Sequence, residues 1–166
     1  TTPVIDRAWP YLRASYPFMV VDAGSQLTEA ALTALDRSHV ILLMLSPELA
    51  ALKAATDAVR VFDQLGYDLD QVLPVINWTF SHDGLPQKNI EAALGCQAAA
   101  VIPYARTSFT RSINTGRPLL MVDPASQVSL AIAKLAYELS LAEMKDNETA
   151  EPSQLLTWVR KVAKAA

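Results

Sequence analysis

Residues 39–48 read HVILLMLSPE, and this stretch decides the fold class. The apolar run that ends at Leu45 is uninterrupted, which is typical of a strand buried on both faces of a parallel sheet. Ser46 then offers a helix-capping side chain, and Pro47 suits the first position of a helix. We therefore expect a buried strand at residues 39–45, followed by a helix that runs as far as the stop signal at Gly66.

The same alternation of strands and helices continues on both sides of this stretch. Further strands are expected at residues 18–22, 72–77 and 99–102, and helices at 26–37, 87–94, 107–115 and 126–143. Pro10 predicts that the helix at residues 4–15 is short or broken. Pro74 argues against a central position in the sheet for the strand at 72–77. Residues 118–122 are expected to be extended. The order predicts an α/β fold with a mostly parallel sheet and flanking helices.

Composition restricts the class of protein. The chain has 166 residues, 51% of them hydrophobic and 19% charged, which favours one globular domain. The formal net charge of −3 gives no general reason to bind nucleic acid, and none is expected. No secretory signal is recognised, and no apolar run approaches the ~18 residues that span a bilayer. The single cysteine, Cys96, predicts a reducing compartment, the cytoplasm, and is interpreted as a buried or loop thiol without a catalytic role.

Candidate site residues stand where the predicted strands end, because ligands of open α/β sheets bind beyond the carboxyl ends of the strands. Asp22 closes one strand and could hold a carboxylate near Mg²⁺, or it could serve only as a helix cap or loop acceptor. Asn77 closes another strand and could hydrogen-bond a flat base with both a donor and an acceptor, or it could form a local Asx-turn. Pro103 and Tyr104 follow the strand at 99–102.

Several motifs are missing from the sequence. Neither G-x-x-x-x-G-K-[ST] nor G-x-G-x-x-G occurs, and only five glycines are present. Nothing in the sequence therefore predicts a cradle for the β- and γ-phosphates of a nucleotide. Residues 81–83, Ser-His-Asp, lie in a predicted loop without a nucleophile elbow and are not interpreted as a triad. No cluster has the spacing of metal ligands.

The pieces resemble the MinD/ParA-type P-loop ATPases in their order and spacing. Residues 16–22, YPFMVVD, resemble the Walker B strand of that family, and residues 112–119, SINTGRPL, are similar to its N-x-G-x-P-L signature. Residues 75–77 and 101–104 look like the segments that end in the family's Asn and in its Ile-Pro strand. The resemblance covers roughly residues 10–142. It implies a partial P-loop NTPase fold without the P-loop strand, which in this family lies between the Walker B strand and the next.

The stretches LGYDLDQV and GLPQKNIEAALG, at residues 65–72 and 84–95, lean toward the CpaE/TadZ pilus-assembly branch. This resemblance implies that residues 1–144 are the C-terminal part of a bacterial ATPase that localises the Flp/Tad pilus assembly machinery. The location would be cytoplasmic, either polar or peripheral to the inner membrane, with pilus or secretion proteins as partners. The alternatives are a non-catalytic interaction module on the same scaffold and an unrelated doubly wound domain that binds a small molecule.

For the complete protein, the resemblance implies ATP and Mg²⁺ as ligands and a nucleotide-controlled homodimer. Asp22 would order Mg²⁺ through water and not as a direct ligand, while Asn77, Pro103 and Tyr104 would surround the adenine. Two departures from the family stand beside these residues: Ala-Gly follows Asp22, and Trp78 replaces the basic residue after Asn77. Without a P-loop, this chain alone is expected to bind no nucleotide and to be inactive.

The C-terminal segment is predicted separately. Residues 145–152 are expected to be a polar linker, and residues 153–166 an amphipathic helix with an apolar stripe and basic residues beside it. Such a helix either makes peripheral contact with an anionic membrane or docks on its own domain or a partner.

Overall fold

The computed structural model describes residues 2–146. By their contacts these residues divide into two compact units, one up to Ile41 and one from Leu42 onward. The larger unit holds a three-stranded parallel sheet in the order β1-β2-β3. The strands are β1 (Ile41–Leu45), β2 (Val72–Asn77) and β3 (Ala100–Ile102), which confirms three of the four predicted strands.

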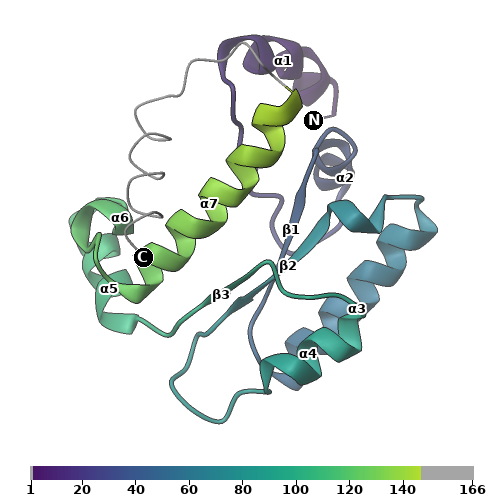
Figure 1. Ribbon diagram of the computed structural model, residues 1–166. Helices are drawn as coiled ribbons and strands as arrows, with labels where there is room; N and C mark the ends of the chain where they lie inside the picture. The colour runs from purple at the N-terminus through teal and green to yellow at the C-terminus, as the bar shows by residue number, and fades with distance from the viewer. Residues whose placement is uncertain (1, 147–166) are drawn as a thin grey trace. The chain divides into compact units, whose positions relative to one another are not determined.

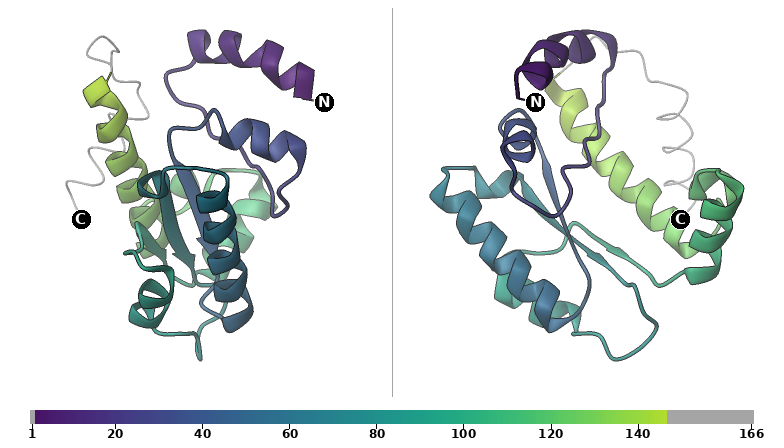
Figure 2. Two further views of the ribbon diagram at one scale, coloured as in Figure 1. Left: turned by 90° about the vertical axis from the view of Figure 1, so that its right-hand side faces the viewer. Right: turned by 180° about the vertical axis from the view of Figure 1, so that it is seen from behind.

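Helices cover the two faces of this sheet (Figures 1 and 2). The helices of the larger unit are α3 (Leu49–Gln64), α4 (Gln87–Leu94), α5 (Arg106–Thr115), α6 (Leu119–Val122) and α7 (Gln127–Asp146), with a short 3-10 helix η1 (Leu69–Gln71) before β2. Successive residues of a strand face opposite sides of a sheet. Ile76 accordingly packs toward α3 and α4, and Val75 packs with Val128 of α7.

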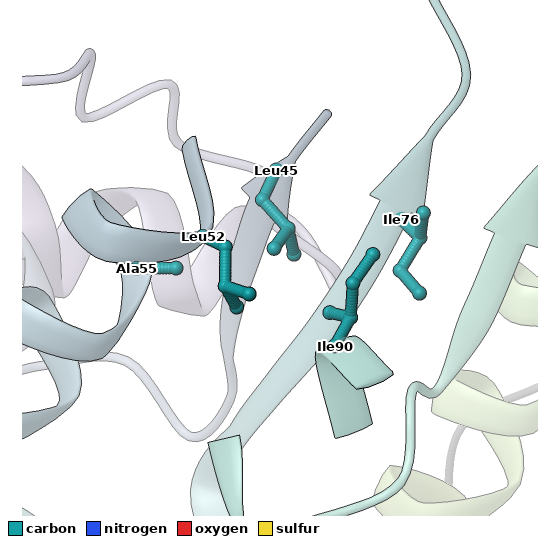
Figure 3. Packing of buried hydrophobic residues seen from close by; sticks show 5 residues of the cluster. All are labelled: Leu45, Leu52, Ala55, Ile76 and Ile90. Carbon is teal, nitrogen blue, oxygen red and sulfur yellow. The ribbon is translucent and has the colours of Figure 1, made fainter. Parts of the chain in front are cut away.

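The core between the sheet and the pair α3–α4 is formed by aliphatic side chains. Figure 3 shows them directed toward one another from β1, β2, α3 and α4: Leu45, Leu52, Ala55, Ile76 and Ile90. Ile90 is fully buried and is the one buried residue of α4. Burial of these groups is the main stabilising contribution in this unit, at about 1.5–3 kcal/mol for each large side chain.

Glycines end the helices as predicted. After α3, Gly66 adopts φ +80, a left-handed conformation that costs glycine little, and the backbone N–H of Tyr67 donates to the carbonyl of Phe62 at 3.0 Å. This hydrogen bond satisfies a carbonyl at the helix end and turns the chain into β2. The same conformation at Gly95 ends α4.

Three local predictions for the larger unit are wrong. Ser46 does not cap α3, because its hydroxyl lies 3.0 Å from the Glu48 carboxylate and Glu48 is the N-cap residue. Residues 119–122 are helical and not extended, since amide groups of this turn donate to the carbonyl of Pro118. Helix α7 continues to Asp146, beyond the predicted start of the linker.

Pro74 lies in the central strand, against expectation. The register pairs Val75 with Ala100, so Pro74 lies opposite Ala99, just before β3 begins. Its carbonyl accepts from the Ala99 N–H at 2.8 Å. The missing N–H of proline therefore falls outside the paired part of the β2–β3 ladder.

The smaller unit contains two helices packed on each other, α1 (Thr2–Ser15) and α2 (Glu29–Leu35). Helix α1 runs through Pro10 without a break, so the prediction of a broken helix is wrong: the proline removes one hydrogen bond, and the packing of α1 on α2 compensates. An ion pair between Asp6 and Arg37 joins the two segments. The Thr28 hydroxyl caps α2 by accepting from the Ala31 N–H at 3.2 Å.

The strand predicted at residues 18–22 is also wrong, because this segment has no regular secondary structure and pairs with no strand of the described chain. Val20 is 97% exposed. A helix long and apolar enough to cross a bilayer does not occur among residues 2–146. The helix predicted at residues 153–166 lies outside the described residues.

Candidate functional site

The carboxyl ends of β2 and β3 lie side by side. Asn77 is aligned with Ile102, and the backbone N–H of Trp78 donates to the Ile102 carbonyl at 2.9 Å. The parallel register therefore brings Asn77 next to the turn that begins at Pro103. The sequence predicted this juxtaposition, because the carboxyl ends of parallel strands meet at one edge of the sheet.

The side chain of Asn77 has no partner among the described residues and is accessible to a ligand. It is half-buried, and within residues 2–146 it makes no hydrogen bond. The local Asx-turn, which was the alternative interpretation, is therefore not formed. A carboxamide supplies acceptor and donor groups together, which matches the paired acceptor and donor groups on the edge of a nucleobase.

Pro103 and Tyr104 provide the apolar part of this site. Pro103 is partly buried, and Tyr104 is 41% exposed. An exposed aromatic ring offers a planar ligand a surface for stacking, and Tyr104 follows β3 at the same edge of the sheet as Asn77.

The sequence did not predict the packing that supports the ends of β2 and β3. Three residues form this packing: Trp78, Gly84 and Pro47. The Leu85 N–H donates to the Pro47 carbonyl at 2.7 Å, so the loop after β2 is tied to the end of β1. A Cβ atom on Gly84 would lie 2.4 Å from the Trp78 ring and 3.0 Å from Pro47. The Phe80 ring meets Trp78 edge-on, with centroids 5.9 Å apart.

Gly84 thus serves close packing and not backbone freedom. It is the one glycine in the sequence whose φ is not positive, since Gly24, Gly66, Gly95 and Gly116 all adopt left-handed conformations. A glycine between two aromatic residues and a helix start was the available signal, but a loop glycine is ordinarily interpreted as a turn residue.

Asp22 belongs to the smaller unit. Its carboxylate accepts from the Gly24 N–H at 2.9 Å, the loop hydrogen bond that was the alternative to a magnesium-linked role. The side chain is exposed and keeps further acceptor capacity.

Two further kinds of chemical group bear on the chemistry of the described chain, metal ligands and the cysteine thiol. No cluster of three or more His, Cys, Asp or Glu residues that could hold a metal occurs in residues 2–146. Cys96 is exposed, and partial burial together with the nearby Glu91 carboxylate raises the pKa of its thiol, which disfavours the nucleophilic thiolate. Hydrogen bonds from Gln87 and the Ala98 amide lower the pKa of Glu91.

One cavity, of about 470 Å³, occurs in the smaller unit and contains none of the candidate residues. Its charged side chains contact one another: Arg37 pairs with Asp6, and Arg13 donates to His39 Nε2 at 3.3 Å.

Solved structures with a similar fold are ATPases of the MinD and ParA type. The cell division ATPase MinD of Pyrococcus furiosus superposes with a TM-score of 0.72 and 22% identity, over 86% of this chain and 59% of that one. The septum site-determining protein MinD of Pyrococcus horikoshii, complexed with Mg-ADP, gives 0.72 and 21% over 87% and 59%. A ParA family ATPase from Chlorobium tepidum gives 0.69 and 21% over 80% and 54%.

No protein-family model matches the sequence, and no curated protein sequence matches it significantly. The chain spans less than two thirds of the length of the solved structures that it matches. At these identities the likeness establishes the architecture of the chain, and this architecture is a partial MinD/ParA-type P-loop ATPase fold.

Proposed function

We propose that this chain is the C-terminal part of a CpaE/TadZ-like ATPase that localises a pilus assembly apparatus. In the complete protein, Asn77, Pro103 and Tyr104 would contact the adenine, and Asp22 would order Mg²⁺ through water. ATP would supply the energy and the signal for homodimerisation. The location is proposed to be cytoplasmic, polar or peripheral to the inner membrane.

The observation that carries the proposal is the pair of adjacent strand ends at Asn77 and Pro103. The Asn77 carboxamide has no intramolecular hydrogen bond within the described residues, and Tyr104, two residues beyond the Ile102 that is aligned with Asn77, is exposed. Among the described residues, neither carboxamide atom of Asn77 is buried without a partner, so its donor and acceptor groups are open to solvent and to a ligand. The resemblance to MinD/ParA proteins assigns that ligand as adenine.

A second observation supports a missing P-loop strand. β1 pairs with β2 on one edge only, and along its other edge no strand of residues 2–146 is paired. Leu42 and Met44 of β1 are 37% and 54% exposed, although they lie in the most apolar segment of the chain. The open edge of this strand is what we expect of a sheet from which one strand is missing, and the exposure of Leu42 and Met44 shows in addition that one face of β1 is incompletely covered.

The absence of a phosphate cradle favours a second candidate, a non-catalytic interaction module on the same scaffold. Trp78 stands where the family has a basic residue, and no P-loop occurs in this sequence. A P-loop with its lysine encoded upstream of residue 1 would support the ATPase and rule out this second candidate.

Calorimetry with Mg-ATP tests the proposal. We expect no binding by this chain alone, because adenine contacts without a phosphate cradle supply too little free energy for micromolar affinity. A longer chain that includes an upstream P-loop should bind Mg-ATP in the micromolar range. In that chain Asn77→Ala should weaken binding about tenfold, the loss expected for one or two buried hydrogen bonds.

The matched control in the longer chain is Gln64→Ala, because Gln64 is an exposed carboxamide at the end of α3, before β2 begins and away from the strand ends. It should leave the affinity for Mg-ATP unchanged. Micromolar binding by residues 1–166 alone would contradict the account of the missing cradle. Equal affinities of the Asn77 variant and its parent would contradict the adenine contact.

Sedimentation with anionic liposomes tests the proposal of peripheral membrane contact. If residues 153–166 form the membrane helix, removing them should abolish most of the binding, and raising the salt concentration should weaken what the full chain binds. Neutral liposomes provide the control. Equal sedimentation of the full and shortened chains would leave docking on the protein itself or on a partner as the role of that segment.

A further inference from the structure

The turn from α3 into β2 carries an acidic patch with exposed leucines. We define the acidic end as Asp63, Leu65, Asp68, Leu69 and Asp70, all of which are exposed. Leu65 is 55% and Leu69 41% exposed. The sequence has no Lys or Arg from residue 61 to residue 87, so no neighbour along the chain neutralises these carboxylates.

The hairpin of α5 and α6 carries a basic patch, in which arginines stand beside exposed apolar side chains. We define the basic end as Arg106, Ile113, Arg117 and Met121, with Ile113 at 76% and Met121 at 63% exposure. Arg106 and Ile113 are separated by two helical turns and lie on one face of α5. The sequence has no Asp or Glu from residue 92 to residue 122, and neither arginine forms an ion pair with any residue in 2–146.

These two patches lie at opposite ends of the same sheet. The acidic end leads through η1 into the first residue of β2, and the basic end follows the last residue of β3. Because β2 and β3 are parallel, one patch lies at the amino edge of the sheet and the other at the carboxyl edge. Figure 1 shows α5 and α6 on one side of this unit and the connection from α3 to β2 on the other.

We propose that the acidic end of one copy of this chain docks on the basic end of another. Each patch combines charge with exposed aliphatic side chains, so the contact would pair carboxylates with guanidinium groups around apolar centres. Since the two patches differ, the contact is head-to-tail and does not close on a twofold axis, which produces open chains of copies. Asn77, Pro103 and Tyr104 belong to neither patch, although Arg106 lies two residues after Tyr104 at the same edge of the sheet.

Two charge-reversal variants suit the test because neither removes a described hydrogen bond. Arg106→Glu with Arg117→Glu places an acid at the start of α5, where the helix dipole favours it. Asp63→Lys with Asp70→Lys places a base in the last turn of α3 and leaves Asp68, whose carboxylate accepts from the amide of residue 70. A matched control, Lys88→Glu with Lys134→Glu, changes the net charge as much as the arginine variant does at exposed positions outside both patches.

Sedimentation velocity over a concentration series measures the association. The unmodified chain should form dimers and longer species, and each patch variant alone should have a Kd raised at least about tenfold by like charges facing each other. An equimolar mixture of the two variants should regain the association, because the intact acidic end of one meets the intact basic end of the other. Raising salt from about 0.1 M to about 1 M, which shortens the Debye length from about 10 Å to about 3 Å, should weaken it.

The control variant should associate like the unmodified chain. The proposal is overturned if the unmodified chain remains monomeric up to about 100 µM, because its Kd for self-association would then be weaker than that of a specific interface. It is equally overturned if either patch variant alone associates as tightly as the unmodified chain, or if the mixture does not associate. Circular dichroism of each variant before mixing shows that the proteins compared are folded.

Discussion

Replacing Ile90 with alanine should lower the free energy of unfolding by about 2–5 kcal/mol, the range measured for buried aliphatic residues in well-packed cores. Ile90 has no exposed surface and contacts the cluster that also contains Leu45 and Ile76. It is also the one buried residue of α4, a helix of 8 residues that is too short to be stable without packing. The variant therefore creates a cavity and loosens the anchor of α4 at the same time.

Urea denaturation followed by circular dichroism measures this loss. The matched control is Leu49→Ala, because Leu49 is an aliphatic residue in the first turn of α3 and is 73% exposed. The control should change the free energy of unfolding by no more than about 0.5 kcal/mol. A loss of less than about 1 kcal/mol for Ile90→Ala would mean that α4 does not pack as described.

The elements that the sequence predicted well are those whose signals are local. The apolar runs at 39–45 and 72–77 are too long and continuous for a surface strand, and Gly66, Gly95 and Gly116 follow helical patterns at the positions where left-handed conformations end a helix. Both signals can be interpreted without knowing what packs against the segment. The α/β fold and the order of its elements from β1 to α5 therefore followed from the sequence, and the solved structures confirm this fold class.

The segment at 18–22 shows where local signals are insufficient. Its composition is that of a buried strand, but a strand also requires a neighbour to hydrogen-bond with, and residues 2–146 provide none. Tertiary context decides strand formation more strongly than the preference of the residues themselves. We expect this segment to become a strand only in a chain that supplies the neighbouring P-loop strand.

The candidate site was predictable only where it depends on the pairing of parallel strands. Asn77 and Pro103 could be placed together from the sequence, because parallel strands bring their carboxyl ends to one edge. The packing of Trp78 against Gly84 could not, because it depends on the path of the loop between them, and loop paths have no periodic signal. The structure therefore adds a support for the Asn77 corner that spacing alone does not reveal.

The second large effect is expected at Gly84. Gly84→Ala places a methyl group 2.4 Å and 2.6 Å from two atoms of the Trp78 ring, closer than carbon atoms approach in folded proteins. The indole ring is rigid and is packed against the core cluster, so either the ring or the loop must move. Overpacking of this kind costs about 1–3 kcal/mol of stability.

A double-mutant cycle with Trp78→Ala isolates this contact by urea denaturation. If the cost of the methyl group comes from the indole ring, Gly84→Ala should destabilise the parent chain but cost less than about 0.5 kcal/mol in the Trp78→Ala background. An equal cost in both backgrounds would assign the effect to the backbone of the loop.

The backbone N–H of Trp78 donates to the Ile102 carbonyl, so a shift of the Trp78 backbone that accommodates the displaced ring would also move the strand ends at Asn77 and Pro103. In a complete chain with a P-loop, Gly84→Ala should therefore weaken Mg-ATP binding although it touches no ligand, which makes Trp78 and Gly84 positioning residues of the proposed site.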